Sequence, residues 1–152
     1  MIQRIQSIYL ALAAVISGIA SFLKVGSFIK GGDRQFIYTM WNVKENVKLE
    51  ALYDNSIFYL GMLGLLITGL ALVTLFLYKN RKKQISFCTV LMGLNLLWVF
   101  SVLFAVPEYI LKAEIEFNPY IAGMLAPVIL IWLAQKAISK DEKMVRAADR
   151  LR

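Results

Sequence analysis

Histidine is absent from this chain, and cysteine and proline are scarce, with one cysteine, Cys88, and three prolines. A lone cysteine cannot form a disulfide within the chain, so any folded loop is held by packing and hydrogen bonds alone. Because the single thiol lies inside an apolar run and no imidazole is present, the sequence argues against a zinc or copper site built from the usual ligands. No metal and no cofactor are expected.

Charge is missing from two long stretches, Ile57 to Tyr78 and Ile85 to Val106, which have 22 residues each. A helix of that length spans about 33 Å, the thickness of the hydrocarbon core of a bilayer. The short basic connection from Lys79 to Gln84 makes the two helices antiparallel neighbours. With further apolar runs at residues 5–23 and 120–137, the sequence predicts an all-α membrane protein, a single four-transmembrane-helix bundle.

The formal net charge of +7 is unevenly distributed along the chain. Eleven cations and three acids fall on the side of the predicted bundle that carries residues 79–84 and both termini, whereas six cations and seven acids fall on the other side. An excess of lysine and arginine marks the cytoplasmic side of a membrane protein. The distribution therefore predicts a multi-pass protein with both termini in the cytoplasm, and it explains the basic composition without nucleic acid.

The start of the chain has two interpretations, a cleaved signal peptide or an uncleaved first helix. Arg4 supplies the positive charge that both would need. The apolar run that follows has 19 residues, more than the roughly 7–15 of a typical signal core. We therefore favour an uncleaved first helix.

Small residues recur at helical spacing in the first two predicted helices. Such stripes let two helix backbones approach closely in a membrane, where dispersion contacts drive association. We expect the two stripes to meet and to pack the first helix against the second, and a dimerisation surface is the alternative. The stripes are Ala11, Ala14, Gly18 and Ser21 in the first helix and Gly61, Gly64 and Thr68 in the second.

The polar segment at residues 24–56 is predicted to lie outside the membrane and to form an antiparallel hairpin or small β-sheet of two or three strands. Gly31-Gly32 separates Val25 to Ile29 from Gln35 to Trp41, and Asn46 to Ala51 alternates apolar with polar side chains. We expect this sheet to rest on the helix ends through alternate side chains, because a free hairpin is marginal in water. A lid over the helix ends is favoured over a binding loop. The alternate sets are Phe36, Tyr38 and Met40, or Ile37 and Trp41.

Asn95 has the most polar side chain at the predicted mid-membrane depth. An unpartnered amide in hydrocarbon costs a few kcal/mol, so we expect Asn95 to face the bundle and to bond to another helix. A ligand contact is the alternative. Trp98 and Trp132 also lie in apolar runs, and core packing is expected for both.

The three prolines are expected to mark the end of the third helix, the start of the fourth and a bend within the fourth. Val106-Pro107 should end the third helix, because proline disfavours helical geometry in the residue before it. Asn118-Pro119 should start the fourth helix, with proline at the first helical position. Pro127 should kink that helix and free the carbonyl of Gly123.

Residues 138–152 are predicted to form a separate cytoplasmic amphipathic helix that begins at the capping-box sequence Ser139 to Glu142. Glu142 is spaced to pair with Arg146. The tail and the basic turn should attract anionic lipid, and docking of a cytoplasmic protein is the alternative. The residues singled out for these contacts are Arg81, Lys82, Lys83, Arg146, Arg150 and Arg152.

Both ends of the chain carry distinctive sequences, MIQRIQSIYL at Met1 to Leu10 and KDEKMVRAADRLR at Lys140 to Arg152. They resemble the bacterial membrane-protein family called domain of unknown function 4293, and the chain length and four-segment layout are similar too. The resemblance implies a protein of the bacterial cytoplasmic membrane with four spanning helices. It implies no activity, substrate or catalytic residue.

The predicted spans contain no carboxylate and no histidine, so they lack the groups on which catalysis and ion-coupled transport usually depend. The leading hypothesis is a non-enzymatic scaffold or accessory subunit that contacts a protein partner or a second copy through its basic tail and external loop. The alternative is a protein that binds or handles lipid or another apolar molecule. A third hypothesis is an interfacial enzyme, which would need external carboxylates to converge: Glu108, Glu114, Glu116, Asp33 and Asp54.

Overall fold

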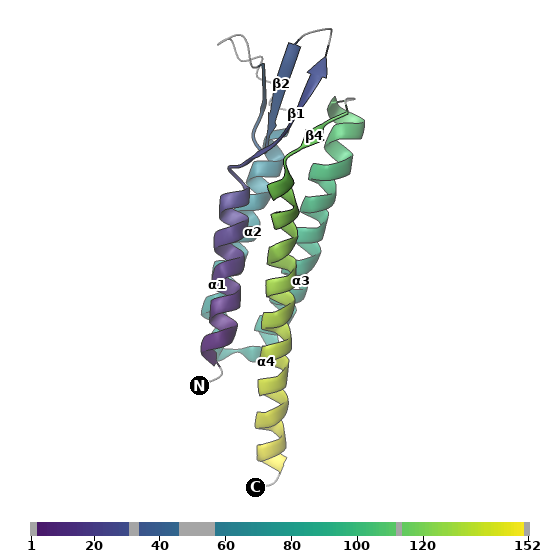
Figure 1. Ribbon diagram of the computed structural model, residues 1–152. Coiled ribbons are helices and arrows are strands. Elements are labelled where there is room, and N and C mark those ends of the chain that lie inside the picture. Colours follow the sequence, from purple (N-terminus) through teal and green to yellow (C-terminus); the bar gives the residue numbers. More distant parts are fainter. Residues whose placement is uncertain (1–2, 31–33, 46–56, 112–113, 151–152) are drawn as a thin grey trace.

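The computed structural model describes residues 3–30, 34–45, 57–111 and 114–150. Four α-helices form an elongated bundle with a small sheet at one end and both chain termini at the other (Figure 1). These ends are named the sheet end and the basic end, the latter after Lys79, Arg81, Lys82 and Lys83. The helices are α1 (Gln3–Ala20), α2 (Phe58–Phe76), α3 (Arg81–Phe100) and α4 (Ala126–Arg150).

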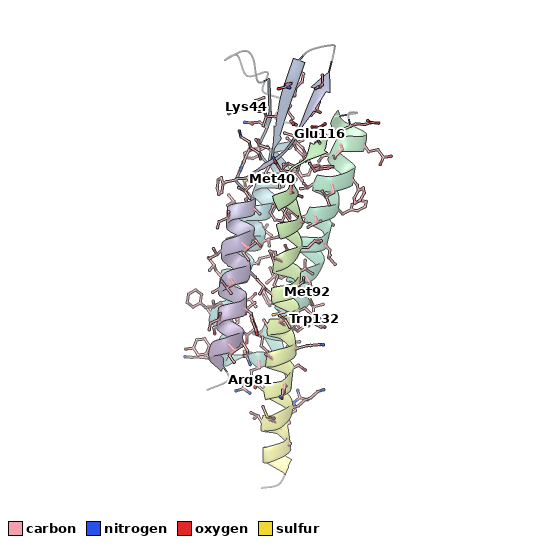
Figure 2. All side chains as sticks on the ribbon, in the orientation of Figure 1. Met40, Lys44, Arg81, Met92, Glu116 and Trp132 are labelled. Atoms are coloured by element: carbon pink, nitrogen blue, oxygen red, sulfur yellow. The ribbon has the colours of Figure 1, made fainter. Side chains whose placement is uncertain are left out.

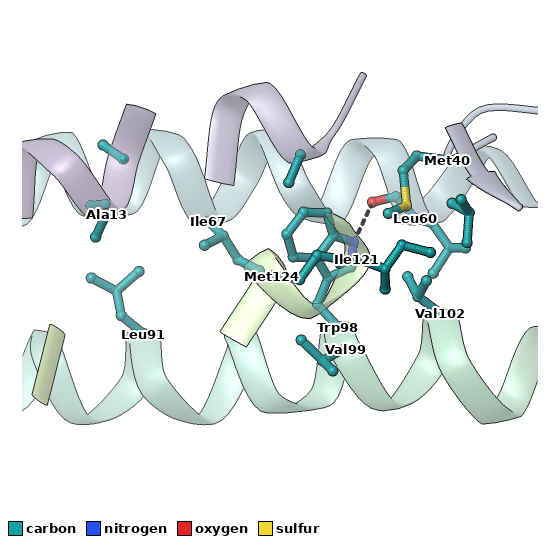
Figure 3. Packing of buried hydrophobic residues seen from close by; sticks show 14 of the residues in the cluster. Ala13, Met40, Leu60, Ile67, Leu91, Trp98, Val99, Val102, Ile121 and Met124 are labelled. Carbon is teal, nitrogen blue, oxygen red and sulfur yellow. Dashed lines mark hydrogen bonds between the residues drawn. The ribbon is translucent and has the colours of Figure 1, made fainter. Parts of the chain in front are cut away.

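Each helix turns one face inward, and the inward positions are spaced alternately by three and four residues. This spacing is typical of helices that pack with a small crossing angle, in which each side chain fits between those of its neighbours. Figure 3 shows the result around Trp98, whose ring is fully buried among aliphatic side chains. The inward residues include Leu60, Gly64, Ile67 and Ala71 in α2, Cys88, Leu91, Asn95 and Trp98 in α3, and Ile131, Ala134, Ile138 and Asp141 in α4.

Polar side chains on these inward faces set the position of α3 along α2. The indole Nε1 of Trp98 donates a hydrogen bond to the carbonyl oxygen of Leu60 at 3.0 Å, toward the sheet end. The amide Nε2 of Gln84 donates to the carbonyl oxygen of Thr74 at 3.2 Å, toward the basic end. Because buried polar groups must find partners inside the protein, these two bonds favour one alignment of the two helices.

The outward faces of the helices are apolar as well. Ile19, Phe76 and Phe100 are 57%, 72% and 60% exposed, although a helix on the surface of a water-soluble bundle would carry polar groups there. Three helical stretches, Phe58–Lys79, Arg81–Glu108 and Ile121–Ala147, are long and apolar enough to cross a membrane, and the apolar part of α1, Ile5–Ala20, is shorter. These features indicate a membrane protein that is mostly helical and carries a small sheet, as predicted.

The sheet has four antiparallel strands in the order β3-β2-β1-β4, one strand more than the maximum expected. The additional strand, β4, follows α3 in the chain and pairs Phe117 with Gly26 and Glu116 with Ser27. The segment Asn46 to Ala51, predicted as a strand, lies outside the described residues. The strands are β1 (Lys24–Lys30), β2 (Arg34–Thr39), β3 (Val43–Glu45) and β4 (Glu116–Phe117).

The sheet is fixed to the helix ends by the segment that follows β2. Tyr38 and Met40 are buried, as one of the two expected sets requires. The backbone N–H of Gly61 in α2 donates to the carbonyl oxygen of Met40 at 3.0 Å. The indole Nε1 of Trp41 donates to the carbonyl oxygen of Ser21 at 2.8 Å, just beyond α1. The sheet is therefore attached to both α1 and α2.

The predicted six-residue connection between the second and third helices is wrong in length. A 3-10 turn, Leu77–Lys79, extends α2, and α3 already begins at Arg81, so Asn80 is the single residue between them. The side chain of Asn80 accepts a hydrogen bond from the N–H of Lys83 and caps α3. Since arginine and lysine are good helix formers, nothing in the sequence excludes residues 81–83 from the helix.

The prediction that Val106-Pro107 ends the third helix is also wrong. The chain continues as a π-helix, Ser101–Leu111, with Pro107 inside it. A wider helical turn changes the hydrogen-bonding pattern and moves the preceding carbonyl groups relative to the proline ring, which reduces the clash that breaks an α-helix. The helical segment therefore continues as far as the sheet end of the molecule (Figure 1).

The fourth helical segment starts at Asn118-Pro119 as predicted, but as a 3-10 helix, Pro119–Leu125, and without a side-chain cap from Asn118. Pro127 is the second residue of α4, where a missing N–H costs no helical bond, and the segment changes from 3-10 helix to α-helix at Ala126. The carbonyl of Gly123 accepts the N–H of Ala126 rather than remaining free. The separate tail helix is wrong too, because α4 runs without a break to Arg150.

Candidate functional site

At the basic end, α1 and α4 are joined by two buried polar side chains. The amide Nε2 of Gln6 donates a hydrogen bond to Oδ2 of Asp141, and each residue is only 6% exposed. The second carboxylate oxygen of Asp141, Oδ1, is buried and has no hydrogen-bond partner. A carboxylate between packed helices costs free energy, so this pair is a candidate for a structural or functional role.

Sequence reasoning missed Asp141 because it assigned this residue to a solvated tail. The signal that locates it is the spacing of the inward face of α4. Ile131, Ala134 and Ile138 are fully buried, and Asp141 follows at the next position of the same three-and-four pattern. Extending the apolar stripe by one turn therefore predicts the burial of this acid.

The first turn of α3 and the last turns of α4 enclose a hollow of about 290 Å³ at the basic end. Arg81 is partly buried, and its Nη1 has no hydrogen-bond partner. Figure 2 shows Arg81 at this end of the bundle. This basic hollow is lined by Lys79, Asn80, Arg81, Lys82, Glu142 and Val145.

The acid in this hollow is already engaged. Glu142 Oε1 lies 3.0 Å from Nη2 of Arg146 and also accepts a bond from its Nε, which confirms the predicted pair. Among the described residues, Arg81 has no ion-pair partner, and Lys83, two residues further along the chain, does not line the hollow. The basic hollow therefore carries three cations in its lining, and its single acid is paired with Arg146.

Beyond Asp141, α4 extends past the ends of the other three helices (Figure 1). Val145 occupies the next inward position of α4, but it is 45% exposed, and its neighbour Met144 is equally exposed. Lys143 and Arg146 are exposed on the same turns. The helix includes Arg150, and Arg152 lies outside the described residues. This α4 extension, residues 142–150, carries three cations and two acids, and its inward position Val145 lies at the wall of the basic hollow and stays largely exposed.

The sheet end brings part of the predicted carboxylate group together. A hollow of about 450 Å³ is lined by Glu114 and Glu116 with Ser27, Phe28, Ile29, Gln35 and Ile115. Glu108 does not line it, and Asp33 and Asp54 lie outside the described residues. Within the described part of the chain, no three acidic or thiol side chains are grouped to hold a metal ion.

Tyr38 is the buried titratable group at the sheet end. It is fully buried in β2, and its hydroxyl has no hydrogen-bond partner. Burial, reinforced by the neighbouring Tyr59, raises the pKa of Tyr38 above the ordinary value of 10.0. The phenol therefore stays protonated at any physiological pH.

Asn95 is fully buried and faces the bundle as expected, but the predicted bond to another helix is wrong. Its Nδ2 donates to the carbonyl oxygen of Leu91 in its own helix at 3.4 Å, and Oδ1 has no partner. A side chain that donates to the carbonyl four residues earlier finds its acceptor within its own helix. Asn95 thus does not tie α3 to a neighbour.

Trp132 is not a core residue, in contrast to the expectation. It is 45% exposed on α4, and the Nζ of Lys136 lies 3.7 Å from the centroid of its ring. A tryptophan paired with lysine on an outward face is typical of the boundary between lipid and water. Trp98 is buried as expected.

The two small-residue stripes meet. A Cβ atom at Gly18 would lie 3.5 Å from Thr68, an ordinary contact, whereas a Cβ at Gly64 would lie 2.3 Å from Oγ of Ser21 and 2.6 Å from the ring of Trp98. A Cβ at Gly61 would lie 2.5 Å from the ring of Trp41. Glycine at positions 61 and 64 is thus required for the close approach of neighbouring side chains.

An apolar groove opens on the outer surface between α1 and α2. Its volume is about 490 Å³, and no polar surface lines it. It lies beside the packed stripes, with Gly18 and Thr68 contributing to its wall. The lining residues are Ala14, Val15, Gly18, Ile19, Phe22, Leu65, Thr68 and Leu72.

These features define a class, a mostly helical protein with a small antiparallel sheet at one end, three helical stretches that are long and apolar enough to cross a membrane, and a helix that projects from the other end. Residues 2–151 match the family model described as Domain of unknown function (DUF4293). The chain therefore belongs to this family, as the sequences at its two ends indicated. Comparisons with curated proteins and with solved structures gave no match.

Proposed function

We propose that the protein resides in the bacterial cytoplasmic membrane with all four helices spanning the bilayer, the sheet outside and the basic end inside. The apolar outward faces and the cluster of cations at one end support this arrangement. With 18 residues, α1 reaches about 27 Å, close to the thickness of the hydrocarbon core, and it packs along α2 and α4.

In this membrane the protein acts as a non-enzymatic scaffold or accessory subunit. The observation that carries the proposal is the α4 extension, because a helix that leaves its bundle with an exposed apolar position and exposed cations offers a surface for another protein. Val145 and Met144 supply apolar area, and Lys143 and Arg146 favour an acidic partner.

Site-specific photo-crosslinking in intact cells tests this proposal. A photoreactive residue at Val145 should yield a defined protein adduct that disappears when Arg146→Glu is added, because the charge reversal repels an acidic partner. The matched control is the same probe at Ile129, which is 58% exposed on the same helix but lies within the proposed span. Adducts to lipid alone at both positions would exclude protein docking through this extension.

The second candidate function is the binding of lipid or another apolar molecule, and the groove between α1 and α2 supports it. An acyl chain fits an apolar lining at this depth. Gly18→Leu should fill the groove and reduce the amount of lipid that is purified with the protein, whereas Gly93→Leu, at an exposed position without neighbouring atoms, should not. Equal lipid content in both variants would eliminate this candidate.

A further inference from the structure

The basic hollow combines three features that together favour the binding of an anion. Its lining carries three cations, Lys79, Arg81 and Lys82, and the acid at its edge, Glu142, is occupied by Arg146. Arg81 is held in place by its position in the first turn of α3 and by partial burial. A guanidinium nitrogen that is buried without an acceptor, as Nη1 is, leaves a strong donor unsatisfied.

The N-terminus of α3, which carries Arg81 and Lys82, also favours the binding of an anion. The first turn of α3 contains no acidic residue, and the partial positive charge of a helix N-terminus adds to the charges of Arg81 and Lys82. Cations that line one hollow repel one another, and a bound anion relieves that repulsion. Asn80 caps only one of the free backbone N–H groups, that of Lys83.

We propose that the basic hollow is a specific binding site for the phosphate of an anionic phospholipid headgroup. The guanidinium of Arg81 donates to phosphate oxygens, and Lys79 and Lys82 supply the remaining positive charge. The inference rests on the proposed membrane insertion, because only a bundle that spans the bilayer places this hollow at the level of the headgroups. Basic pockets at the cytoplasmic ends of spanning helices are suited to anionic headgroups.

Charge selects the type of lipid. A headgroup with a quaternary ammonium would bring a fourth cation into a hollow that already holds three, so phosphatidylglycerol should bind more tightly than phosphatidylcholine. The hollow is open enough to admit a headgroup from the membrane plane, with a volume of about 290 Å³. Phosphatidylglycerol is therefore the probe for the test.

Native mass spectrometry of the full chain in detergent, titrated with phosphatidylglycerol, measures this site. Arg81→Gln should weaken binding of the first lipid about tenfold, the loss expected for one charge-assisted hydrogen bond. The matched control is Lys83→Gln, which removes the same charge from the same turn at an exposed position outside the lining, and it should weaken binding less than about twofold. The lipid affinity of Arg81→Lys should lie between those of the two glutamine variants, because lysine retains the charge but lacks the planar guanidinium that can donate two parallel hydrogen bonds.

Three results would overturn the inference. Equal weakening by Arg81→Gln and Lys83→Gln would mean diffuse attraction and no site. Equal affinity for phosphatidylcholine would exclude selection by charge. Displacement of phosphatidylglycerol by glycerol phosphate at equal concentration would assign the hollow to a soluble phosphate. Recovery of the protein in the membrane fraction is measured separately, so failure of the proposed membrane insertion is distinguishable from failure of this site.

Discussion

At the scale of single residues, Gly64 faces the tightest packing. A methyl group at this position would lie 2.3 Å from Oγ of Ser21 and 2.6 Å from the buried ring of Trp98, so Gly64→Ala forces one of these side chains to move. We expect a loss of about 1–3 kcal/mol in the free energy of unfolding, measured by denaturant titration in detergent. Gly69→Ala, where no atom lies within 4 Å, should be neutral or stabilising by up to about 1 kcal/mol. Equal effects of the two substitutions would contradict this packing.

Tyr38 links stability to pH. Because burial raises the pKa of Tyr38 in the folded state above 10.0, its stabilising contribution is complete below pH 10 and is lost as the pH rises toward the folded-state pKa. Tyr38→Phe removes an unpartnered buried hydroxyl, so it should leave the stability at pH 8 unchanged or slightly higher and should reduce the loss above pH 10. Thermal melts in detergent from pH 8 to 11 measure both effects. The same alkaline loss in the variant and the parent protein would refute the role of Tyr38.

Asp141 shows why some buried polar residues are hard to recognise in a sequence. Its neighbours Lys140, Glu142 and Lys143 are charged, so the local composition indicates a solvated tail. For Asn95 the predicted burial is confirmed and the predicted partner is wrong. Its partner depends on which backbone carbonyl lies within reach of the side chain. Position on the inward face of a helix therefore predicts burial better than local composition does, and neither one predicts the hydrogen-bond partner.

At the scale of elements, the bond between Gln6 and Asp141 holds the end of α1 against α4. Gln6→Leu leaves a buried carboxylate with neither oxygen paired, so we expect a loss of at least about 1–3 kcal/mol in the free energy of unfolding. The double variant Gln6→Leu with Asp141→Leu should recover much of that loss, because no unpaired charge remains. Denaturant titrations of the two single variants and the double variant give the coupling between the sites. Additive losses would show that the two side chains do not stabilise each other.

The helices were predictable as elements because long apolar runs are unambiguous, whereas their ends were not. Pro107 lies in a π-helix, and residues 81–83 join α3, since the end of a helix depends on backbone geometry and neighbouring capping groups as well as residue type. The strand β4 has two residues, too few to show alternation, and its partner β1 lies far away in the sequence. Non-local pairing of this kind carries no local sequence signal.

At the scale of the whole molecule, the three-and-four spacing of inward residues explains how the four helices pack against one another. The same spacing in all four helices permits a single bundle, and the segment after β2 attaches the sheet to the ends of α1 and α2. The basic end combines the buried Gln6–Asp141 pair, the basic hollow and the α4 extension. The two ends of the bundle therefore differ in chemistry, as a protein with a fixed orientation in a membrane requires.

Cysteine labelling of intact bacterial cells that express the protein tests this orientation most directly. In a Cys88→Ala background, single cysteines replace Lys44 in the sheet or Lys143 in the α4 extension, both at exposed positions. A membrane-impermeant maleimide should label the Lys44→Cys protein in intact cells and the Lys143→Cys protein only after the cytoplasmic membrane is permeabilised. Labelling of Lys143→Cys in intact cells, or recovery of the protein in the soluble fraction, would contradict the account.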